Sequence, residues 1–275
     1  MTINGKGQLI DLVSPKVMGI LNVTSNSFFD GGKFKTESLI LSQVEKMLSD
    51  GATFIDIGAY SSKPSAEFVS EKEELQRIVP IVQLILEKFP ETLISIDTFR
   101  SEVAKACLEN GAAIINDISA GNLDDKMLEI IAKYNVPYIM MHMRGTPQTM
   151  QTMTNYDNIV KEILFYFSER VSKARSYGIN DVVIDPGFGF AKTVEQNYEV
   201  LQKLGLFEIL ELPLLVGFSR KSMIYKILNS NAQEALNGTT ALNTIALTKG
   251  AKILRVHDVK EAIECVTLFN KLKGQ

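Results

Sequence analysis

Residues 92–116 read TLISIDTFRSEVAKACLENGAAIIN and contain one complete strand–helix–strand unit. Thr92–Ile96 and Ala112–Ile115 are apolar runs of strand length, and Ser101–Glu109 between them has helical periodicity. Gly111 stands just past the helix, where a glycine commonly ends one. Runs that are apolar throughout are typical of strands buried on both faces, so the unit predicts a parallel sheet covered by helices.

The same unit recurs along the chain. Eight apolar runs of strand length end 19 to 43 positions apart, close to the size of a βα unit: Val17–Leu21, Thr53–Ile57, Thr92–Ile96, Ala112–Ile115, Pro137–Met141, Val182–Ile184, Leu214–Phe218 and Lys252–Val256. Segments with helical periodicity lie between and after them: Leu39–Ser49, Glu73–Lys88, Ser101–Glu109, Lys126–Lys133, Ile159–Tyr177, Tyr198–Leu204, Ser222–Leu228, Thr239–Thr248 and Val259–Lys271.

Eight strands alternating with helices in 275 residues predict an α/β fold, a single (β/α)8 TIM barrel over residues 1–275. An open, doubly wound parallel sheet is the alternative, although no GxGxxG follows the first strand. No linker or change of composition divides the chain.

Charge and hydropathy exclude several classes of function. The chain has 29 Lys and Arg against 32 Asp and Glu, a formal net charge of −3, so no positive surplus is available to coat a nucleic acid. No apolar run approaches the ~18–20 residues that cross a bilayer, and residues 1–16 lack the apolar core of a signal peptide. Cys107 and Cys265 lie far apart in helical segments, typical of small buried residues in a reducing compartment. We expect a cytoplasmic protein without nucleic-acid or membrane partners.

Polar residues stand directly after the predicted strands. The positions are Asn22, Gly58, Asp97, Asn116, His142, Asp185, Ser219 and His257, and seven of the eight are polar. Asp and Asn also form turns, but a barrel carries its active site at these strand ends, so the pattern predicts a polar site at one mouth. The carboxylates there could bind a divalent metal (with Asp97 and His142 as candidate ligands), act as acid and base, or grip an amidine-like ligand through two N–H bonds.

Cationic groups follow the last two strands. Ser219–Ser222 (SRKS) comes after the seventh run, and Arg255 and His257 bracket the end of the eighth. Barrels often hold a phosphate in these two loops. The alternative for Arg220 is an ordinary surface ion pair.

Two long loops, residues 22–35 and 58–70, follow the first two strands and are typical of lids or binding loops. Phe28 and Phe29 would either cover a flat substrate or anchor the first loop to the surface.

Seven segments together resemble the dihydropteroate synthase family of pterin-binding enzymes, collinearly from about residue 17 to 261: VMGILNVTSNSFFDGG (17–32), SIDTFRSEV (95–103), GAAIINDIS (111–119), MHMRGTPQTMQ (141–151), DPGFGFAKT (185–193), LPLLVGFSRKSMI (212–224) and KILRVHDVKE (252–261). The resemblance implies a transferase of folate biosynthesis. It would condense 6-hydroxymethyl-7,8-dihydropterin diphosphate with 4-aminobenzoate, releasing pyrophosphate by an SN1-like route with Mg²⁺ as cofactor. It also implies a homodimer and a sulfonamide target.

The resemblance assigns roles to matching residues. The pterin would contact Asp97, Asn116, Asp185 and Lys221, and the diphosphate Asn22, Arg255 and His257, with Mg²⁺ near Asn22. The 4-aminobenzoate would lie against Ser62, Lys63, Ser219 and Ser222, while Lys221, Arg255, His257 and Asp97 would be catalytic. Asp56 would act through waters in the metal site or, alternatively, accept backbone amides.

The first two loops depart from the family pattern. Ser62-Lys63-Pro64-Ser65 replaces the usual Thr-Arg-Pro-Gly, Ala59-Tyr60 replaces Gly-Glu, and Ser25-Asn26 replaces Pro-Asp. Lysine keeps the charge of arginine but loses its planar fork. The alternatives are therefore a non-catalytic pterin-binding paralogue and a methyltetrahydrofolate methyltransferase, which shares the barrel but does not need the anion-binding groups.

Overall fold

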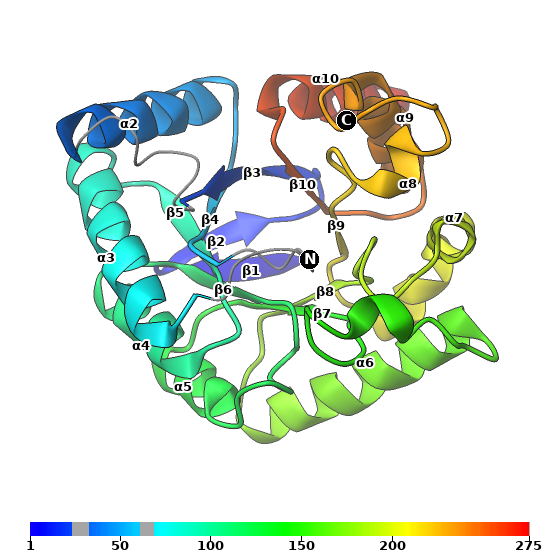
Figure 1. Ribbon diagram of the computed structural model, residues 1–275, viewed down its shortest axis with the longest axis horizontal. Coiled ribbons are helices and arrows are strands. Elements are labelled where there is room, and N and C mark those ends of the chain that lie inside the picture. Colours follow the sequence, from blue (N-terminus) through cyan, green and yellow to red (C-terminus); the bar gives the residue numbers. More distant parts are fainter. Residues whose placement is uncertain (24–32, 61–68, 275) are drawn as a thin grey trace.

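A computed structural model describes residues 1–23, 33–60 and 69–274 of the chain. Within these residues, eight parallel strands form one sheet in the order β8-β7-β6-β5-β4-β3-β10-β9 (Figure 1). They are β3 (Lys16–Asn22), β4 (Phe54–Gly58), β5 (Leu93–Asp97), β6 (Ile114–Asp117), β7 (Tyr138–Met141), β8 (Val182–Asp185), β9 (Leu215–Val216) and β10 (Ile253–Val256). A parallel bridge between Ile184 and Leu214 joins the first strand of this order to the last, which closes the barrel. The predicted TIM barrel is confirmed.

Helices surround the barrel and alternate with its strands (Figure 1). They are α2 (Lys33–Ser49), α3 (Glu71–Lys88), α4 (Ser101–Glu109), α5 (Met127–Tyr134), α6 (Ile159–Ser176), α7 (Val194–Gln202), α8 (Ser222–Tyr225), α9 (Leu236–Thr248) and α10 (Val259–Leu272), with 3-10 turns η2 (Met150–Thr152) and η3 (Leu204–Leu210). The largest shift from the sequence prediction is at α2, which begins at Lys33 and not at Leu39. Helix α7 begins at Val194, before the predicted Tyr198, because Thr193 and Gln196 form a capping box there.

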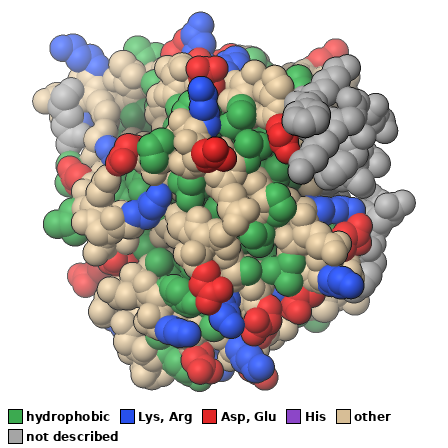
Figure 2. All heavy atoms as spheres, turned by 90° about the vertical axis from the view of Figure 1, so that its left-hand side faces the viewer, with side chains coloured by type: hydrophobic (Ala, Val, Ile, Leu, Met, Phe, Trp, Pro, Cys, Tyr) green, Lys and Arg blue, Asp and Glu red, His purple; other side chains and the backbone are tan. Residues whose placement is uncertain are grey.

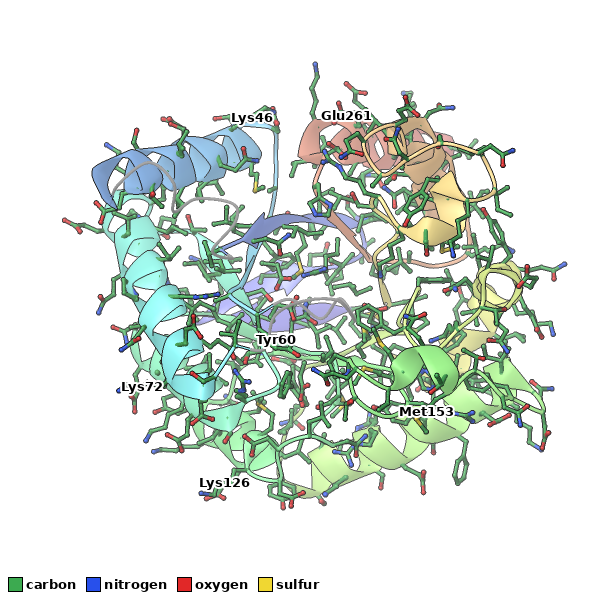
Figure 3. The ribbon with its side chains drawn as sticks, in the orientation of Figure 1. Lys46, Tyr60, Lys72, Lys126, Met153 and Glu261 are labelled. Carbon is green, nitrogen blue, oxygen red and sulfur yellow. The ribbon has the colours of Figure 1, made fainter. Side chains whose placement is uncertain are left out.

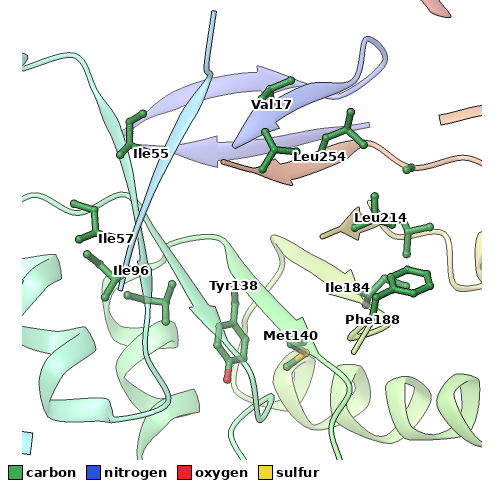
Figure 4. Close-up of a cluster of buried hydrophobic side chains, with 14 of the residues drawn as sticks. Val17, Ile55, Ile57, Ile96, Tyr138, Met140, Ile184, Phe188, Leu214 and Leu254 are labelled. Atoms are coloured by element: carbon green, nitrogen blue, oxygen red, sulfur yellow. The ribbon is translucent and has the colours of Figure 1, made fainter. Parts of the chain in front are cut away.

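The main core lies between the strands and the helices. Outward-facing strand residues such as Val17, Ile55, Tyr138 and Leu254 are buried in this layer (Figure 4). Side chains alternate between the two faces of a strand, so their neighbours Met18, Phe54, Ile139 and Ile253 point into the barrel. These inner side chains form a separate apolar cluster near the amino ends of the strands.

A two-stranded hairpin, β1 (Thr2–Gly5) and β2 (Gln8–Asp11), covers that end of the barrel. Its Ile3 and Ile10, with Leu12 just beyond, are buried in the inner apolar cluster. Asn4 N donates to Asp181 Oδ2 over 3.0 Å, which ties the hairpin to the loop before β8. The sequence prediction missed this hairpin because its strands, TING and QLID, contain no continuous apolar run.

The surface of the described residues fits the balanced composition. Acidic and basic side chains are interspersed on the face shown in Figure 2. Cys107 and Cys265 are buried in α4 and α10, as predicted. No helix among the described residues is long and apolar enough to span a membrane.

Candidate active site

A polar layer lies above the inner apolar cluster. The strand period of two puts Asp56 on the same inner face of β4 as Phe54, and places Ser95, Asn116 and Arg255 on the inner faces of β5, β6 and β10. The inner lining therefore changes from apolar to hydrogen-bonding toward the carboxyl ends of the strands, where a barrel carries its active site.

Two glycines leave space among the side chains at the carboxyl end of the barrel. A Cβ at Gly58 would lie 3.4 Å from the Cβ of Asp97, and one at Gly217 would lie 3.7 Å from the carbonyl oxygen of Arg255. Both positions face the polar layer, so glycine there leaves room beside the two charged side chains.

Arg255 joins two carboxylates across the barrel. Its Nε donates to Asp56 Oδ2 and its Nη2 to Asp97 Oδ2, both over 2.6 Å. Asp56 also accepts from Ser95 Oγ at 2.6 Å and from Asn116 Nδ2 at 3.2 Å. The hydrogen bonds therefore connect β4, β5, β6 and β10, and they fix Asn116 and Arg255 in orientation.

The charges of this cluster are strongly coupled. Burial raises the pKa of Asp97 to about 7, although the nearby Arg255 guanidinium opposes the rise. Burial lowers the pKa of Arg255, but Asp56 and Asp97 outweigh that effect and raise it above its ordinary value. Arg255 therefore stays protonated, and the raised pKa of Asp97 puts its proton exchange near neutral pH.

Asp185 and Lys221 form the opposite side of the site. Asp185 is 6% exposed, accepts from Gly187 N at 2.8 Å, and has its pKa raised by burial. Lys221 Nζ donates to the carbonyl of Phe188 and lies 5.0 Å from the centre of the Phe190 ring. Burial lowers the pKa of Lys221 to about 8, with the Asp185 charge opposing the change. A ligand here would meet both a carboxyl group and an amine whose charges influence each other.

Ser219 and His257 meet at the rim. Ser219 Oγ lies 2.9 Å from His257 Nδ1 and accepts from His257 N at 3.2 Å. Beside them, Arg220 Nη2 donates to Asp258 Oδ1 over 2.7 Å, and its side chain is 43% exposed. The surface ion pair was the correct interpretation of Arg220. Ser222 begins the short helix α8.

The structure brings together the four residues predicted for the pterin, Asp97, Asn116, Asp185 and Lys221, and adds to them Arg255, which was predicted for the diphosphate. Asn22 ends β3 with an exposed side chain. Ser62 and Lys63, and also Phe28 and Phe29, lie outside the described residues.

His142 does not join a metal site with Asp97. Its ring packs edge-on against Tyr166 of α6 at 4.9 Å between centroids, and its Nδ1 lies 3.1 Å from Lys192 Nζ. Burial is the main cause that lowers the pKa of His142 well below its ordinary value, and the charge of Lys192 is the second cause. No group of three His, Cys, Asp or Glu side chains suited to a metal occurs in the described part of the chain. The sequence hypothesis of an Asp97–His142 metal pair is wrong.

The contacts of two supporting residues were not predicted from the sequence. Asp56 was expected to contact waters or backbone amides, but its partners in the described chain are the side chains of Ser95, Asn116 and Arg255. The available signal was the spacing of two between Phe54 and Asp56 in TFIDI, because residues two apart in a strand share one face and Asp56 therefore points inward with Phe54. Lys192, a cation within the apolar stretch after Asp185, was not singled out at all.

Tyr60 stands where the family pattern has glutamate, at the start of the second long loop (Figure 3). Its ring packs edge-on against Phe99 at 5.4 Å, and its hydroxyl accepts from Gln148 Nε2 at 3.1 Å. The Arg100 guanidinium lies 5.4 Å from the ring centre. The departure thus replaces a carboxylate with an aromatic contact.

Comparison with known proteins identifies the family. The family model for pterin binding enzyme matches residues 18–257. Dihydropteroate synthase of Escherichia coli K12 is 43% identical over 268 residues, covering 97% of this chain and 94% of the relative. A Yersinia pestis dihydropteroate synthase in a sulfonamide drug complex superposes with a TM-score of 0.93 at 41% identity, covering all of both chains. A Xanthomonas albilineans dihydropteroate synthase with 4-aminobenzoic acid gives 0.92 at 33% identity, covering 100% of this chain and 98% of the other. The chain therefore belongs to the pterin-binding enzymes and, within them, to the dihydropteroate synthases, which are transferases of folate biosynthesis.

Proposed function

We propose that this chain condenses 6-hydroxymethyl-7,8-dihydropterin diphosphate with 4-aminobenzoate to give 7,8-dihydropteroate and pyrophosphate. The observation that carries the proposal is the polar layer in which Asp97, Asn116 and Asp185 lie with Lys221 and Arg255. Relatives with the same fold bind a sulfonamide drug and 4-aminobenzoic acid.

The pocket suits the edge of a pterin. Asp185 can accept two N–H bonds from the aminopyrimidinone, while Asn116 and Asp97 satisfy its remaining polar atoms and Lys221 donates to its carbonyl side. Each of these buried groups costs about 1–3 kcal/mol if left unpaired, which disfavours flat rings without the matching donors and acceptors.

The reaction depends on stabilising the departing pyrophosphate more than on a catalytic base. The bond between the pterin methylene carbon and the diphosphate oxygen breaks with its electron pair going to pyrophosphate. Conjugation with the dihydropterin stabilises the resulting cation, so the step is SN1-like. Arg255 and His257 neutralise the charge that develops on the departing diphosphate. The 4-aminobenzoate nitrogen then forms the new C–N bond and releases a proton to solvent.

The residues present fit a magnesium ion held largely by the substrate. Asn22 would contribute one amide oxygen at the end of β3, and Mg²⁺ commonly takes few protein ligands together with phosphate oxygens and waters. When bound, Mg²⁺ supplies further charge neutralisation at the diphosphate. The 4-aminobenzoate is assigned to Ser219 and Ser222 and, in the second long loop, to Ser62 and Lys63.

A condensation assay tests the proposal. Purified chain with both substrates and Mg²⁺ should release pyrophosphate and form dihydropteroate in equal amounts, and chelation should slow the reaction. Binding of the pterin without pyrophosphate release would instead support the non-catalytic paralogue. Methyl transfer from methyltetrahydrofolate would support the methyltransferase, which does not need the diphosphate contacts Arg255 and His257. The homodimer stays a prediction that sedimentation velocity can test.

A further inference from the structure

Lys192 is a buried lysine that the proposed reaction does not use. It lies in the loop between β8 and α7, and 5% of its surface is exposed. Its Nζ donates to Gly187 O at 2.9 Å and to Phe190 O at 3.0 Å, and it lies 3.1 Å from His142 Nδ1, which accepts in the tautomer that carries the ring proton on Nε2. An ammonium has three N–H donors, so the three contacts satisfy it completely. Burying a lysine costs free energy unless its amine is hydrogen-bonded, so these contacts offset the cost of burying Lys192.

The two carbonyls flank the part of the loop that holds Lys221. Between them, Phe188 O accepts the hydrogen bond from Lys221 Nζ. At the second of them, the Phe190 ring lies 5.0 Å from the same Nζ. A Cβ at Gly189, whose φ is +83°, would lie 3.3 Å from Lys221 Cδ, so the backbone itself packs against the lysine stem. The position of the Lys221 ammonium therefore depends on the conformation of residues 187–190.

The contacts of Lys192 with the two carbonyl oxygens do not depend on a single protonation state of its amine. Burial lowers the pKa of Lys192 to about 7, with the Asp185 charge opposing the change. A neutral amine still has two N–H donors, enough for both carbonyls, and the His142 ring nitrogen can then donate or accept according to its tautomer.

We propose that Lys192 is a positioning residue for the pterin site, because its side chain clamps the carbonyls of Gly187 and Phe190 and so fixes the loop that presents Lys221. The inference rests on the proposed function in one respect, the contact between Lys221 and the pterin. A purely structural lysine would stabilise the fold without acting through Lys221.

A double-mutant cycle separates these two roles. Free 6-hydroxymethylpterin is the probe, and its Kd is measured by calorimetry for the unmodified chain, Lys192→Met, Lys221→Met and the double variant. If Lys192 acts through Lys221, Lys192→Met weakens binding about tenfold in the unmodified chain but less than about twofold when Lys221 is already methionine. Equal losses in the two backgrounds, or no loss in either, would overturn the proposal.

The matched control is Lys249→Met. Lys249 Nζ also donates to a main-chain carbonyl, that of Gln202 at 2.9 Å, but at the exposed end of α9. Its removal should leave the pterin Kd unchanged in both backgrounds. If Lys192→Met does not fold, Lys192→Gln keeps two N–H donors and carries the same cycle, with a smaller loss expected in the unmodified chain only.

The same measurements distinguish failure of this inference from failure of the proposed function. An unmodified chain that does not bind the pterin overturns the proposed function and this inference with it. Normal binding by the unmodified chain, combined with additive losses in the cycle, overturns the positioning role alone.

Discussion

Arg255 of β10 and Asp97 of β5 share a hydrogen bond of 2.6 Å from Nη2 to Oδ2. The sequence placed these residues in two separate groups, a cation for the diphosphate and a carboxylate for the pterin. In the folded chain they are one unit, because the guanidinium also binds Asp56 through Nε. A change at either residue should therefore affect both halves of the proposed substrate.

Replacing Asp185 by Asn should reduce pterin affinity more than about 100-fold, because the amide has a single acceptor oxygen where two N–H groups require a carboxylate. Burial raises the pKa of Asp185, so its ionised form opposes folding near neutral pH and the variant should melt no lower than the unmodified chain. Titration calorimetry and a melting curve measure the two effects. Asp181→Asn, at the opposite end of β8 beside Asn4, is the control and should keep full affinity. Unchanged affinity in Asp185→Asn would refute its assigned role.

Replacing Arg255 by Ala should weaken the diphosphate-bearing pterin about 10- to 100-fold more than the free pterin, since charge-assisted hydrogen bonds to the diphosphate are lost. Comparing the Kd of the two ligands gives the ratio. Arg220→Ala removes a neighbouring arginine that pairs with Asp258, and should change the ratio little. Equal losses for both ligands in Arg255→Ala would count against an anion contact.

The contribution of Asp97 to the free energy of unfolding should fall as the pH rises from about 4 to about 7. Its pKa is raised to about 7 when folded, so between its unfolded value near 4 and that pKa the folded chain binds the extra proton. Raising the pH through this window removes the contribution. Urea unfolding at pH 5 and pH 7.5 should therefore show a smaller pH-dependent loss for Asp97→Asn than for the unmodified chain, while the exposed Asp125→Asn should keep the full loss. Parallel curves for all three chains would contradict the assignment.

Replacing Arg100 by Met should lower the free energy of unfolding by about 3–5 kcal/mol, because it leaves the buried Glu74 carboxylate without its ion pair. The change also removes the hydrogen bond of 2.7 Å from Nη2 to Val69 O. Urea unfolding measures the loss. Lys105→Met removes an exposed cation 4.0 Å from Glu102, and should stay within about 0.5 kcal/mol of the unmodified chain. A similar small change for Arg100→Met would show that Glu74 finds another partner or is protonated.

Replacing Ile3 by Ala in the hairpin should cost about 2–5 kcal/mol through the cavity left in the inner apolar cluster. Pterin affinity should stay the same, because the cluster lies at the opposite end of the barrel from the polar layer. Leu9→Ala, at a side chain 77% exposed, should change neither quantity. A loss of affinity in folded Ile3→Ala would mean that the hairpin affects the site directly.

The sequence predicted the repeated unit well where the local pattern was strong. All eight barrel strands overlap their predicted runs, and α4 matches its predicted bounds of Ser101 and Glu109. Boundaries were less certain where a cap decided them, as at Thr193, because a capping box depends on two side chains rather than on an apolar period.

The sequence could predict which residues belong to the candidate site, but not their contacts with one another. The position of each polar residue directly after a strand was enough to select Asp97, Asn116 and Asp185, since barrel geometry brings such ends together. The same rule selected His142, whose ring instead packs against α6, because a strand-end residue can face either side of the barrel wall.

By itself, the sequence determined the barrel, the family and the residue types at one mouth, because apolar periodicity and strand-end polarity are local patterns. Tertiary structure alone decided that Asp56 holds Arg255, that Arg255 is shared with Asp97, and that Lys192 clamps the loop under Lys221. The first pair is separated by 199 positions in sequence. No local pattern encodes such contacts, since they arise only when closure of the barrel brings distant strands into hydrogen-bonding distance.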